Sequence, residues 1–295
     1  MKIAVTGSEG FLGRLIVDAL RSRGHEVAEC TKGNCDVLNP MQVKKALRGV
    51  QAVVHCAAKL DEDGPSTYEV NVKGTENVLE ACAQNSINQF IFLSTAGIYG
   101  PADGEKSEES EPAPQTIYEK SKLEAERRVL SYQEVFCVTI LRPALVLGSN
   151  KYWSDIIKTV RKGFPLIGEG NYTWQIACAG DVADAAAFLA GKEESFCETF
   201  NVAEKDPMTL REIVELIRKE SGMEGRVRTI PVWLGSIIAQ VNSLLNFDPI
   251  LKPAYLKRML RERKYSIKKL EALGWEPKCS ARGEIAKIVK RQSAK

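Results

Sequence analysis

No apolar run in this 295-residue sequence approaches the roughly 20 residues that a bilayer-spanning helix needs. The amino terminus begins directly with a strand-like run, so we expect no secretory signal peptide. The sequence also lacks an excess of one charge, since 41 Lys and Arg against 38 Asp and Glu give a net charge of +3. This net charge is too small to indicate nucleic acid or an anionic membrane surface as a partner. These absences favour a cytoplasmic protein with no transmembrane segment and no nucleic-acid partner.

Metal-ligand patterns are lacking as well. The eight cysteines are scattered without a C-x-x-C pair, and the two histidines, His25 and His55, lie in no cluster with ligand spacing. Without a secretion signal, we expect the cysteines to be reduced thiols, most of them small buried hydrophobes. The sequence therefore predicts neither a disulfide nor a metal site.

Strand-like and helix-like segments alternate through the first half of the chain. Short β-branched runs at 3–6, 26–30, 52–55, 90–93 and 136–141 are separated by helical patterns at 11–21, 40–48, 66–84 and 118–133. This alternation predicts the α/β class, with a doubly wound parallel sheet covered by helices on both faces. Such sheets bind ligands at the carboxyl ends of their strands.

Three unevenly spaced glycines follow the first strand in the pattern T-G-x-x-G-x-x-G. Gly7 permits a sharp turn, Gly10 lets the backbone approach a pyrophosphate, and Gly13 allows close packing of helix on strand. A helix that begins at Phe11 presents free N–H groups and a partial positive charge to phosphates. We therefore predict a dinucleotide site on this loop, with contacts from Gly7, Ser8, Glu9, Gly10, Phe11, Leu12 and Gly13.

The second half is less regular and predicts a smaller, mainly helical lobe. Helical patterns lie at 152–162, 182–190, 210–220, 232–245 and 282–290, and the acidic stretch 100–115 predicts a surface loop that forms a mobile rim. We expect residues 1–148 and about 178–205 to form a dinucleotide-binding Rossmann domain. Residues 149–177 and 206–295 would then form the substrate-binding lobe.

Five further motifs follow the glycines in order: VVHCAA (53–58), NVKGTENVLEAC (71–82), FLSTAGIYG (92–100), YEKSK (118–122) and LRPALVLG (141–148). Together they resemble the extended branch of the short-chain dehydrogenase/reductase superfamily, the NAD(P)-dependent epimerase/dehydratase family, over the whole chain. The nearest resemblance is to 3β-hydroxysteroid dehydrogenases and dihydroflavonol reductases. It implies hydride transfer between a nicotinamide cofactor and a small molecule, and a homodimer through the helices that begin near residues 66 and 118.

The predicted catalytic groups are Tyr118, Lys122 and Thr95. Tyr118 and Lys122 lie four apart on a helix and share a face. A tyrosine with a pKa of roughly 10 needs help near neutrality, and we expect a nearby ammonium and the nicotinamide charge to lower its pKa. The resemblance implies that Lys122 also bonds the nicotinamide ribose, and that the hydroxyl four residues before Tyr99, Thr95, binds the substrate oxygen. Ser94 is a lesser candidate.

The end of the second strand bears on the choice between NADP and NAD. Thr31 occupies the position where an NAD enzyme usually carries an acid, and Lys32 follows it. A hydroxyl and a cation suit a 2′-phosphate, so we expect NADP, with NAD as the alternative; Glu29 should point away. The resemblance also implies cofactor contacts from Asp36, Val37, Cys56, Ala57, Ala58, Leu93, Pro143 and Val146, besides Tyr118 and Lys122.

Three functions fit these motifs. An oxidoreductase acting on a largely apolar hydroxyl or carbonyl compound is favoured, because Ala144 and Leu145 replace polar groups common in sugar-nucleotide enzymes and the stretch 230–247 is strongly apolar. A nucleotide-sugar epimerase or dehydratase is the alternative. Such enzymes often bind the substrate diphosphate with an arginine, and this chain has none between residues 172 and 181, though Arg161 or Lys162 could substitute. A non-catalytic NAD(P)-sensing protein is the third possibility, but such proteins typically lose the Tyr or Lys.

Overall fold

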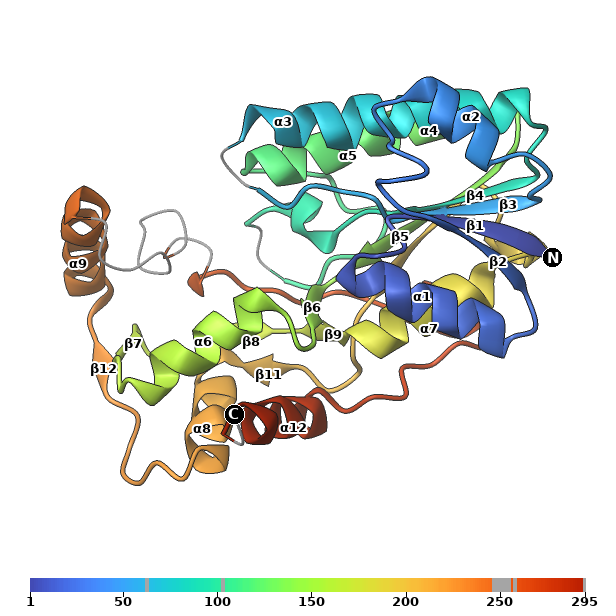
Figure 1. Ribbon diagram of the computed structural model, residues 1–295. Helices are drawn as coiled ribbons and strands as arrows, with labels where there is room; N and C mark the ends of the chain where they lie inside the picture. The colour runs from blue at the N-terminus through green and yellow to red at the C-terminus, as the bar shows by residue number, and fades with distance from the viewer. Residues whose placement is uncertain (62–63, 102–103, 246–255, 257–258, 294–295) are drawn as a thin grey trace.

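Six parallel strands form the central sheet, in the order β10-β5-β4-β3-β1-β2 (Figure 1). They are β1 (Lys2–Thr6), β2 (Glu26–Cys30), β3 (Ala52–His55), β4 (Gln89–Leu93), β5 (Cys137–Pro143) and β10 (Glu198–Val202). The order reverses between β1 and β3, since β2 and β3 flank β1 on opposite sides. This confirms the doubly wound parallel sheet and places its switch point beside the end of β1. The computed structural model describes residues 1–61, 64–101, 104–245, 256 and 259–293.

Helices cover both faces of this sheet because its central strands are apolar on both sides. On one face lie α1 (Phe11–Ser22) and α7 (Ala179–Leu189), and on the other α2 (Pro40–Ala46), α4 (Gly74–Gln84) and α5 (Ile117–Leu130). Neighbouring residues of β3 show the alternation: Val54 belongs to the core beneath α1 and α7, and Val53 to the core beneath α4 and α5.

The helix expected over 66–84 is continuous, but it is not a regular α-helix throughout. It consists of α3 (Pro65–Tyr68), the π-helical segment η1 (Glu69–Lys73) and α4. The π segment contains Asn71, whose side chain bonds neighbouring segments of the chain. Such wide turns are rare and often lie at functional sites.

The smaller lobe has its own core, enclosed by α6 (Lys151–Arg161), α8 (Leu210–Glu220) and α12 (Ala281–Ser293). Its short strand pairs are β6 (Leu145–Leu147) with β9 (Ile176–Cys178), β7 (Leu166–Ile167) with β12 (Thr229–Ile230), and β8 (Thr173–Trp174) with β11 (Met208–Thr209). Helix α9 (Val232–Leu245) stands at the end of the lobe farthest from the sheet (Figure 1). The remaining short elements are η2 (Ala96–Tyr99), η3 (Glu193–Ser195) and α11 (Lys268–Ala272).

Part of the C-terminal chain returns to the sheet. Ile267, Leu270 and Trp275 are buried in the core beneath α1 and α7, and the indole N–H of Trp275 donates to Asp184 at 3.0 Å. The division of the chain into two domains stays a prediction, and residues 267–275 are the part of the expected lobe that packs on the sheet.

The acidic loop is anchored rather than a free rim. The Lys106 backbone N–H donates to the Lys264 carbonyl at 2.8 Å, and the Ser266 N–H donates to the Lys106 carbonyl at 2.8 Å. The Glu108 side chain accepts the Asn201 N–H at 2.7 Å. The expectation of a mobile rim was therefore wrong for residues 105–110, because chain segments remote in sequence hold them.

The cysteines also depart from expectation. Cys178 and Cys279 form a disulfide beside Asp181, whose carboxylate accepts the Cys279 N–H at 3.1 Å. A sequence separation of 101 residues hides this proximity, so the expectation that all the cysteines are free thiols was wrong for this pair. Within the described parts of the chain, no helix has the length and apolar character to cross a membrane.

Candidate active site

The glycine loop lies between the end of β1 and the start of α1, at the switch point of the sheet. Gly7 has φ +68°, and a Cβ there would lie 2.8 Å from the Ala57 Cα. A Cβ at Gly13 would lie 2.1 Å from the Gly7 carbonyl oxygen. Both positions therefore require glycine, Gly7 for its backbone angle and Gly13 for close packing. Gly10 caps α1 without a side chain, so the first N–H groups of the helix lack a side-chain cap.

The strand next to the loop supports it through side chains. Imidazole Nδ1 of His55 lies 2.7 Å from the Thr6 hydroxyl, and Nε2 lies 3.1 Å from the Thr75 hydroxyl. Burial, together with the charge of Lys122, lowers the pKa of His55 to about 3, so the ring is neutral at pH 7. The Cys56 thiol donates to the Thr6 carbonyl at 2.8 Å. Cys56 and Ala57 thus lie directly beside the glycine loop, and the expected cofactor contacts of Cys56, Ala57 and Ala58 stay a prediction.

The end of β2 holds Glu29 away from the strand end, as expected, whereas the roles of Thr31 and Lys32 stay predictions. Glu29 pairs with Arg21 of α1 at 2.7 Å, so its carboxylate is committed away from the strand end. The Thr31 hydroxyl donates to the Asn34 Oδ1 at 3.3 Å, and Lys32 is exposed. Asp36 accepts the Leu38 N–H at 3.0 Å. A cation and a hydroxyl therefore follow β2, and the contacts of both with the adenosine ribose stay a prediction.

Residues after β5 meet the glycine loop across the sheet edge. Gly148 lies against the Phe11 ring, since a Cβ there would be 2.2 Å from its Cζ. The Val146 carbonyl accepts the Trp153 indole N–H at 2.9 Å, which fixes the turn after Pro143. Leu93 ends β4 within the same core as Val146. The structure thus brings the predicted nicotinamide-side residues to the same edge as the phosphate-side residues.

Tyr118 and Lys122 lie on the first turns of α5, which begins with a capping box between Thr116 and Glu119. Lys122 is 2% exposed, and its ammonium lies 4.0 Å from the centre of the Phe92 ring. Burial lowers the pKa of Lys122 to about 7, although the nearby Glu126 and Cys56 raise it. Its charge is therefore finely balanced at neutral pH.

The expected effect of Lys122 on Tyr118 is not seen in the protein alone. Burial raises the pKa of Tyr118, and the negative charge of Glu119 raises it further. The ammonium lies over Phe92 instead. In the chain without cofactor, burial and Glu119 thus raise the pKa of Tyr118, and its expected lowering by the ammonium together with the nicotinamide charge stays a prediction.

Thr95 lies next to the start of α5. Its hydroxyl accepts the Gly97 N–H at 3.0 Å, and a Cβ on Gly97 would lie 3.2 Å from the Thr95 Oγ1 and 3.4 Å from Glu119 Oε1. Ser94 is 6% exposed, and its hydroxyl has no hydrogen-bond partner among the described residues. Both candidate hydroxyls thus stand at the carboxyl end of β4, close to the tyrosine helix.

Asn71 connects the π segment to the tyrosine helix. Its Nδ2 donates to the Ser121 hydroxyl at 2.9 Å and to the Lys59 carbonyl at 3.0 Å, while its Oδ1 accepts the Lys59 N–H at 2.8 Å. Ser121 in turn donates to the Tyr118 carbonyl at 2.8 Å. The sequence carries no local signal for this role of Ser121. The bonds show that Asn71 holds the chain after β3 against α5.

A buried ion pair beneath the site was also missed. Glu126 receives two bonds from Arg142, Nε to Oε1 at 3.1 Å and Nη2 to Oε2 at 2.7 Å. Arg142 Nη1 also donates to the Tyr99 hydroxyl at 2.9 Å, and that hydroxyl donates to Asn201 at 2.8 Å. The sequence signal that could have indicated this pair is Arg142 itself, because it lies inside an otherwise apolar strand and a buried arginine needs a partner.

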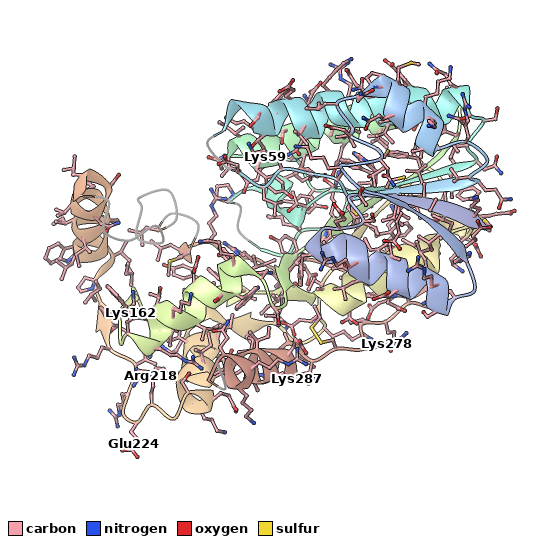
Figure 2. All side chains as sticks on the ribbon, viewed as in Figure 1. Lys59, Lys162, Arg218, Glu224, Lys278 and Lys287 are labelled. Atoms are coloured by element: carbon pink, nitrogen blue, oxygen red, sulfur yellow. A yellow bond between two sulfur atoms is a disulfide. The ribbon has the colours of Figure 1, made fainter. Side chains whose placement is uncertain are left out.

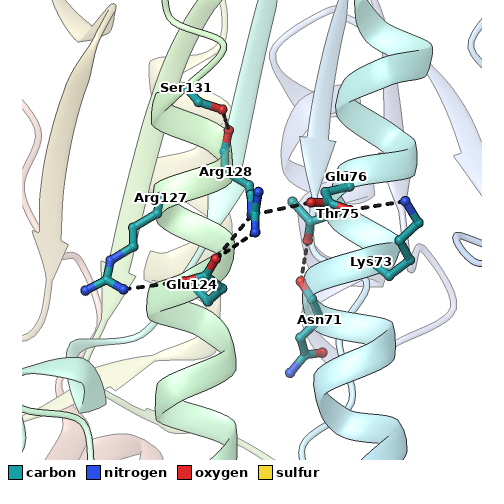
Figure 3. Close-up of polar contacts among 8 residues, drawn as sticks. All are labelled: Asn71, Lys73, Thr75, Glu76, Glu124, Arg127, Arg128 and Ser131. Carbon is teal, nitrogen blue, oxygen red and sulfur yellow. Dashed lines mark hydrogen bonds and ion pairs between the residues drawn. The ribbon is translucent and has the colours of Figure 1, made fainter.

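Polar and charged side chains link α5, α4 and η1 (Figure 3). Arg128 of α5 reaches Glu76 of α4 at 3.4 Å and also pairs with Glu124 at 3.1 Å. Lys73 pairs with the same Glu76 at 3.2 Å. Charged side chains thus link the two helices within one chain.

Three cations are candidates for binding an anionic group of the substrate: Arg161 and Lys162, which the sequence suggested, and Arg261. Arg161 donates to the Ser221 hydroxyl at 3.1 Å and to the Val289 carbonyl at 2.9 Å, so it holds α12. Lys162 is exposed at the outer end of the lobe (Figure 2). Neither therefore replaces a substrate-binding arginine. Arg261, which sequence reasoning missed, lies 3.9 Å from Glu119 with its side chain 14% exposed.

The residues at this edge fit a dinucleotide. The hydroxyl of the fully buried Ser8, within the glycine loop, has no hydrogen-bond partner in the described chain, and the same holds for Ser94. Two unpartnered buried hydroxyls flank a loop in which side chains are excluded and helix N–H groups are uncapped. The fold and this site together define a nucleotide-dependent enzyme with a tyrosine–lysine pair at the sheet edge.

Comparison with known proteins gives the family. The chain matches the model of the NAD dependent epimerase/dehydratase family over residues 3–203, and it belongs to that family. It is 29% identical to a 2-alkyl-3-oxoalkanoate reductase of Stenotrophomonas maltophilia, over 72% of this chain and 74% of that protein. It is 27% identical to the sterol-4-alpha-carboxylate 3-dehydrogenase, decarboxylating, of Saccharomyces cerevisiae, over 86% and 80% of the two chains.

A solved structure agrees with this assignment. The UDP-glucose 4-epimerase of Thermus thermophilus, in complex with NAD, superimposes with a TM-score of 0.77 and 27% identity over 98% of each chain. The protein is therefore an enzyme of the extended short-chain dehydrogenase/reductase type that uses a nicotinamide cofactor for hydride transfer. The roles of individual site residues stay predictions.

Proposed function

We propose that this enzyme transfers a hydride between NADP and the hydroxyl-bearing or carbonyl carbon of a largely apolar small molecule. The observation that carries the proposal is the convergence of Thr95, Tyr118 and Lys122 on the sheet edge that holds the glycine loop. In this scheme Tyr118 exchanges a proton with the substrate oxygen. Thr95 donates a hydrogen bond to that oxygen, and Lys122 binds the nicotinamide ribose. When bound, the cofactor supplies or accepts the hydride.

An apolar substrate is supported by the two relatives, whose names specify 3-oxoalkanoate and sterol carboxylate substrates. Both names describe apolar compounds with an acid group near the reacting carbon. Arg261, beside Glu119, gives this site a cation for such a group. Support from the lobe is weaker than the sequence suggested, because Ala144 and Leu147 are buried in the cores and the large side chains of α9 face outward.

The test is a screen of cofactor oxidation with apolar ketones and 3-oxo acids, with UDP and UDP-sugars as competitors. Tyr118→Phe should keep cofactor binding in calorimetry and lose most turnover. Tyr132→Phe, just after the C-terminal end of α5, is the matched control and should remain active. Undiminished turnover in Tyr118→Phe would refute the catalytic assignment.

A nucleotide-sugar epimerase is the second candidate, supported by the likeness to the UDP-glucose 4-epimerase and by Arg261, which suits a diphosphate equally well. UDP binding to the enzyme–cofactor complex at micromolar concentration, with no ketone reduced, would favour it over the oxidoreductase.

For the cofactor, we propose tighter binding of NADP than of NAD, because Lys32 is exposed and Glu29 is held by Arg21. A charge-assisted bond to the 2′-phosphate is worth roughly 1.5–3 kcal/mol, which is about one to two decades in affinity. Lys32→Glu should reverse the preference, whereas Lys44→Glu, on the exposed side of α2, should not. Equal dissociation constants for NAD and NADP in the unaltered protein would contradict the assignment.

We propose a homodimer formed through α4 and α5, in the cytoplasm. The resemblance to dimeric relatives supports the dimer. Six of the eight cysteines are free and one pair forms a disulfide, and this balance supports a reducing compartment. Sedimentation velocity should then give twice the chain mass of 32.6 kDa. A monomer at micromolar concentration would contradict the dimer.

A further inference from the structure

Helix α9 turns its small residues toward the protein and its large apolar residues toward solvent. Gly235 and Ala239 lie on the inner side; Ala239 is 1% exposed, and a Cβ at Gly235 would lie 2.4 Å from Ile167 Cγ2. Asn242 continues this buried side one turn further on. Close contact with the lobe is therefore made by residues with little side chain, the reverse of an ordinary surface helix.

The outward side is strongly apolar. Its residues recur at intervals of three or four, so they share one face of the helix. They are Trp233 (65% exposed), Ile237 (50%), Val241 (49%) and Leu244 (84%). The sequence of α9, VWLGSIIAQVNSLL, contains no charged residue. Such a contiguous apolar surface marks an interaction site rather than ordinary surface variation.

The chain on both sides of α9 is basic. Residues 225–264 contain eight Lys and Arg and two Asp and Glu, whereas the rest of the chain contains 33 and 36. The chain-wide net charge of +3 conceals this concentration. Arg261 and Arg263 are turned inward, toward Glu119 and over the Trp174 ring.

Several of the remaining cations lie at the foot of α9 or near it. Arg226 and Arg228 are exposed immediately before β12, the strand that leads into the helix. Lys162 and Arg218 are labelled at the outer end of the lobe in Figure 2, together with one acid, Glu224. An apolar helix face with cations at its base matches the chemistry of an anionic lipid surface.

We propose that α9 docks the protein on the surface of an anionic membrane, with its apolar face at the boundary between headgroups and acyl chains. A second copy of this chain fits less well, because a symmetric contact through α9 would bring two strongly basic segments together. The helix is about 21 Å long at 1.5 Å per residue, which is too short to span a bilayer, and its inner side packs on the lobe, so it lies in the interface plane.

The position of α9 gives such docking an orientation. Figure 1 places it on the side of the molecule toward which the carboxyl ends of the sheet strands point. A membrane held by α9 would therefore face the same side as the candidate active site. The docking itself does not depend on the proposed function, and its test requires no substrate.

The first measurement uses the intrinsic fluorescence of the full-length protein. Of its four tryptophans, Trp153, Trp174 and Trp275 are at most 2% exposed, so only Trp233 can change its surroundings strongly on binding. Vesicles with equal parts phosphatidylglycerol and phosphatidylcholine should shift the emission to the blue, and high salt should weaken the effect. Equal binding to pure phosphatidylcholine would overturn the electrostatic part of the proposal, and no shift with either would overturn all of it.

Variants then locate the contact by vesicle sedimentation. The double variant Ile237→Ser, Leu244→Ser should lower partitioning at least tenfold, whereas Met41→Ser, at a 78% exposed position on α2, should not. Arg226→Glu with Arg228→Glu should lower it more than tenfold on anionic vesicles, since each surface cation contributes about fivefold. Because all these positions are exposed, circular dichroism should show unchanged folding. Unchanged partitioning of the α9 double variant would overturn the proposal. It would also be overturned if the unaltered protein is an oligomer that does not bind vesicles and the α9 double variant is a monomer.

Discussion

Replacing Lys122 by methionine should stabilise the folded protein at neutral and acidic pH while abolishing turnover. The ammonium is 2% exposed, and burial holds its pKa at about 7. An unfolded lysine has a pKa near 10.5. The folded state therefore releases this proton before the unfolded state does, and between these two values the unfolded chain binds more protons.

The magnitude follows from the difference between the two pKa values. Each unit corresponds to about 1.4 kcal/mol, so the charged lysine costs about 4–5 kcal/mol below pH 7. At pH 9 about 2 kcal/mol of that cost remains. Methionine avoids the cost but loses the contact of the ammonium with Phe92, worth about 1–2 kcal/mol. The expected gain is therefore about 3 kcal/mol at pH 6. At pH 9 the folded lysine is neutral and makes no ammonium contact with Phe92, so the gain falls to the remaining cost of about 2 kcal/mol.

Urea denaturation at pH 6 and pH 9 measures this directly on the protein without cofactor. Lys120→Met, at an exposed position on the same helix, is the matched control and should show no pH-dependent difference from the unaltered protein. The reasoning fails if Lys122→Met is less stable than the unaltered protein at pH 6, or if its advantage is the same at both pH values.

Three further predictions concern the loop, the buried pair and the hydroxyl. Gly13→Ala should lower cofactor affinity more than tenfold in calorimetry, because its methyl group would lie 2.1 Å from the Gly7 carbonyl oxygen; affinity within twofold would contradict this. Glu126→Ala should lower the free energy of unfolding by about 3–5 kcal/mol in urea, because it leaves Arg142 buried and unpaired, and a loss below about 1 kcal/mol would argue against that burial. Thr95→Val should reduce kcat about 10²–10³-fold with cofactor binding unchanged, by analogy with loss of one oxyanion donor, and an unaltered kcat would leave Ser94 as the donor.

The sheet was predictable because its signals are local. The strands over 26–30 and 52–55 have the predicted bounds, as do the helices over 210–220 and 232–245. Each is a short apolar run or an uninterrupted helical segment that needs no distant partner to be recognised. The start of α2 is equally local, because Asn39 lies directly before Pro40 and its side chain accepts the Gln42 N–H at 3.2 Å.

What escaped prediction depends on contacts between remote segments. The π segment forms where the Asn71 side chain bonds Lys59 and Ser121, and the helix propensities of the residues do not predict those bonds. The Cys178–Cys279 disulfide joins positions 101 residues apart.

The same limit applies to the candidate site. Motif order located Tyr118 and Lys122, yet their pKa values depend on how deeply α5 is buried, which a motif does not report. Arg261 reaches Glu119 from the far end of the chain, so no local spacing could place it there.

The π segment between α3 and α4 also fits one residue more into the helix than a regular α-helix would hold. Each residue of an α-helix turns by about 100° and each residue of the wider π segment turns by less, so its five residues rotate the chain about as far as four α-helical residues would. Deleting one residue within Glu69–Lys73 should therefore give a regular helix with α3 in nearly the same rotational phase relative to α4. Thr67, fully buried with its hydroxyl donating to the Asp61 carbonyl at 2.6 Å, should then keep its place. The same deletion within the regular helix α4 would instead rotate everything that precedes it by about 100°.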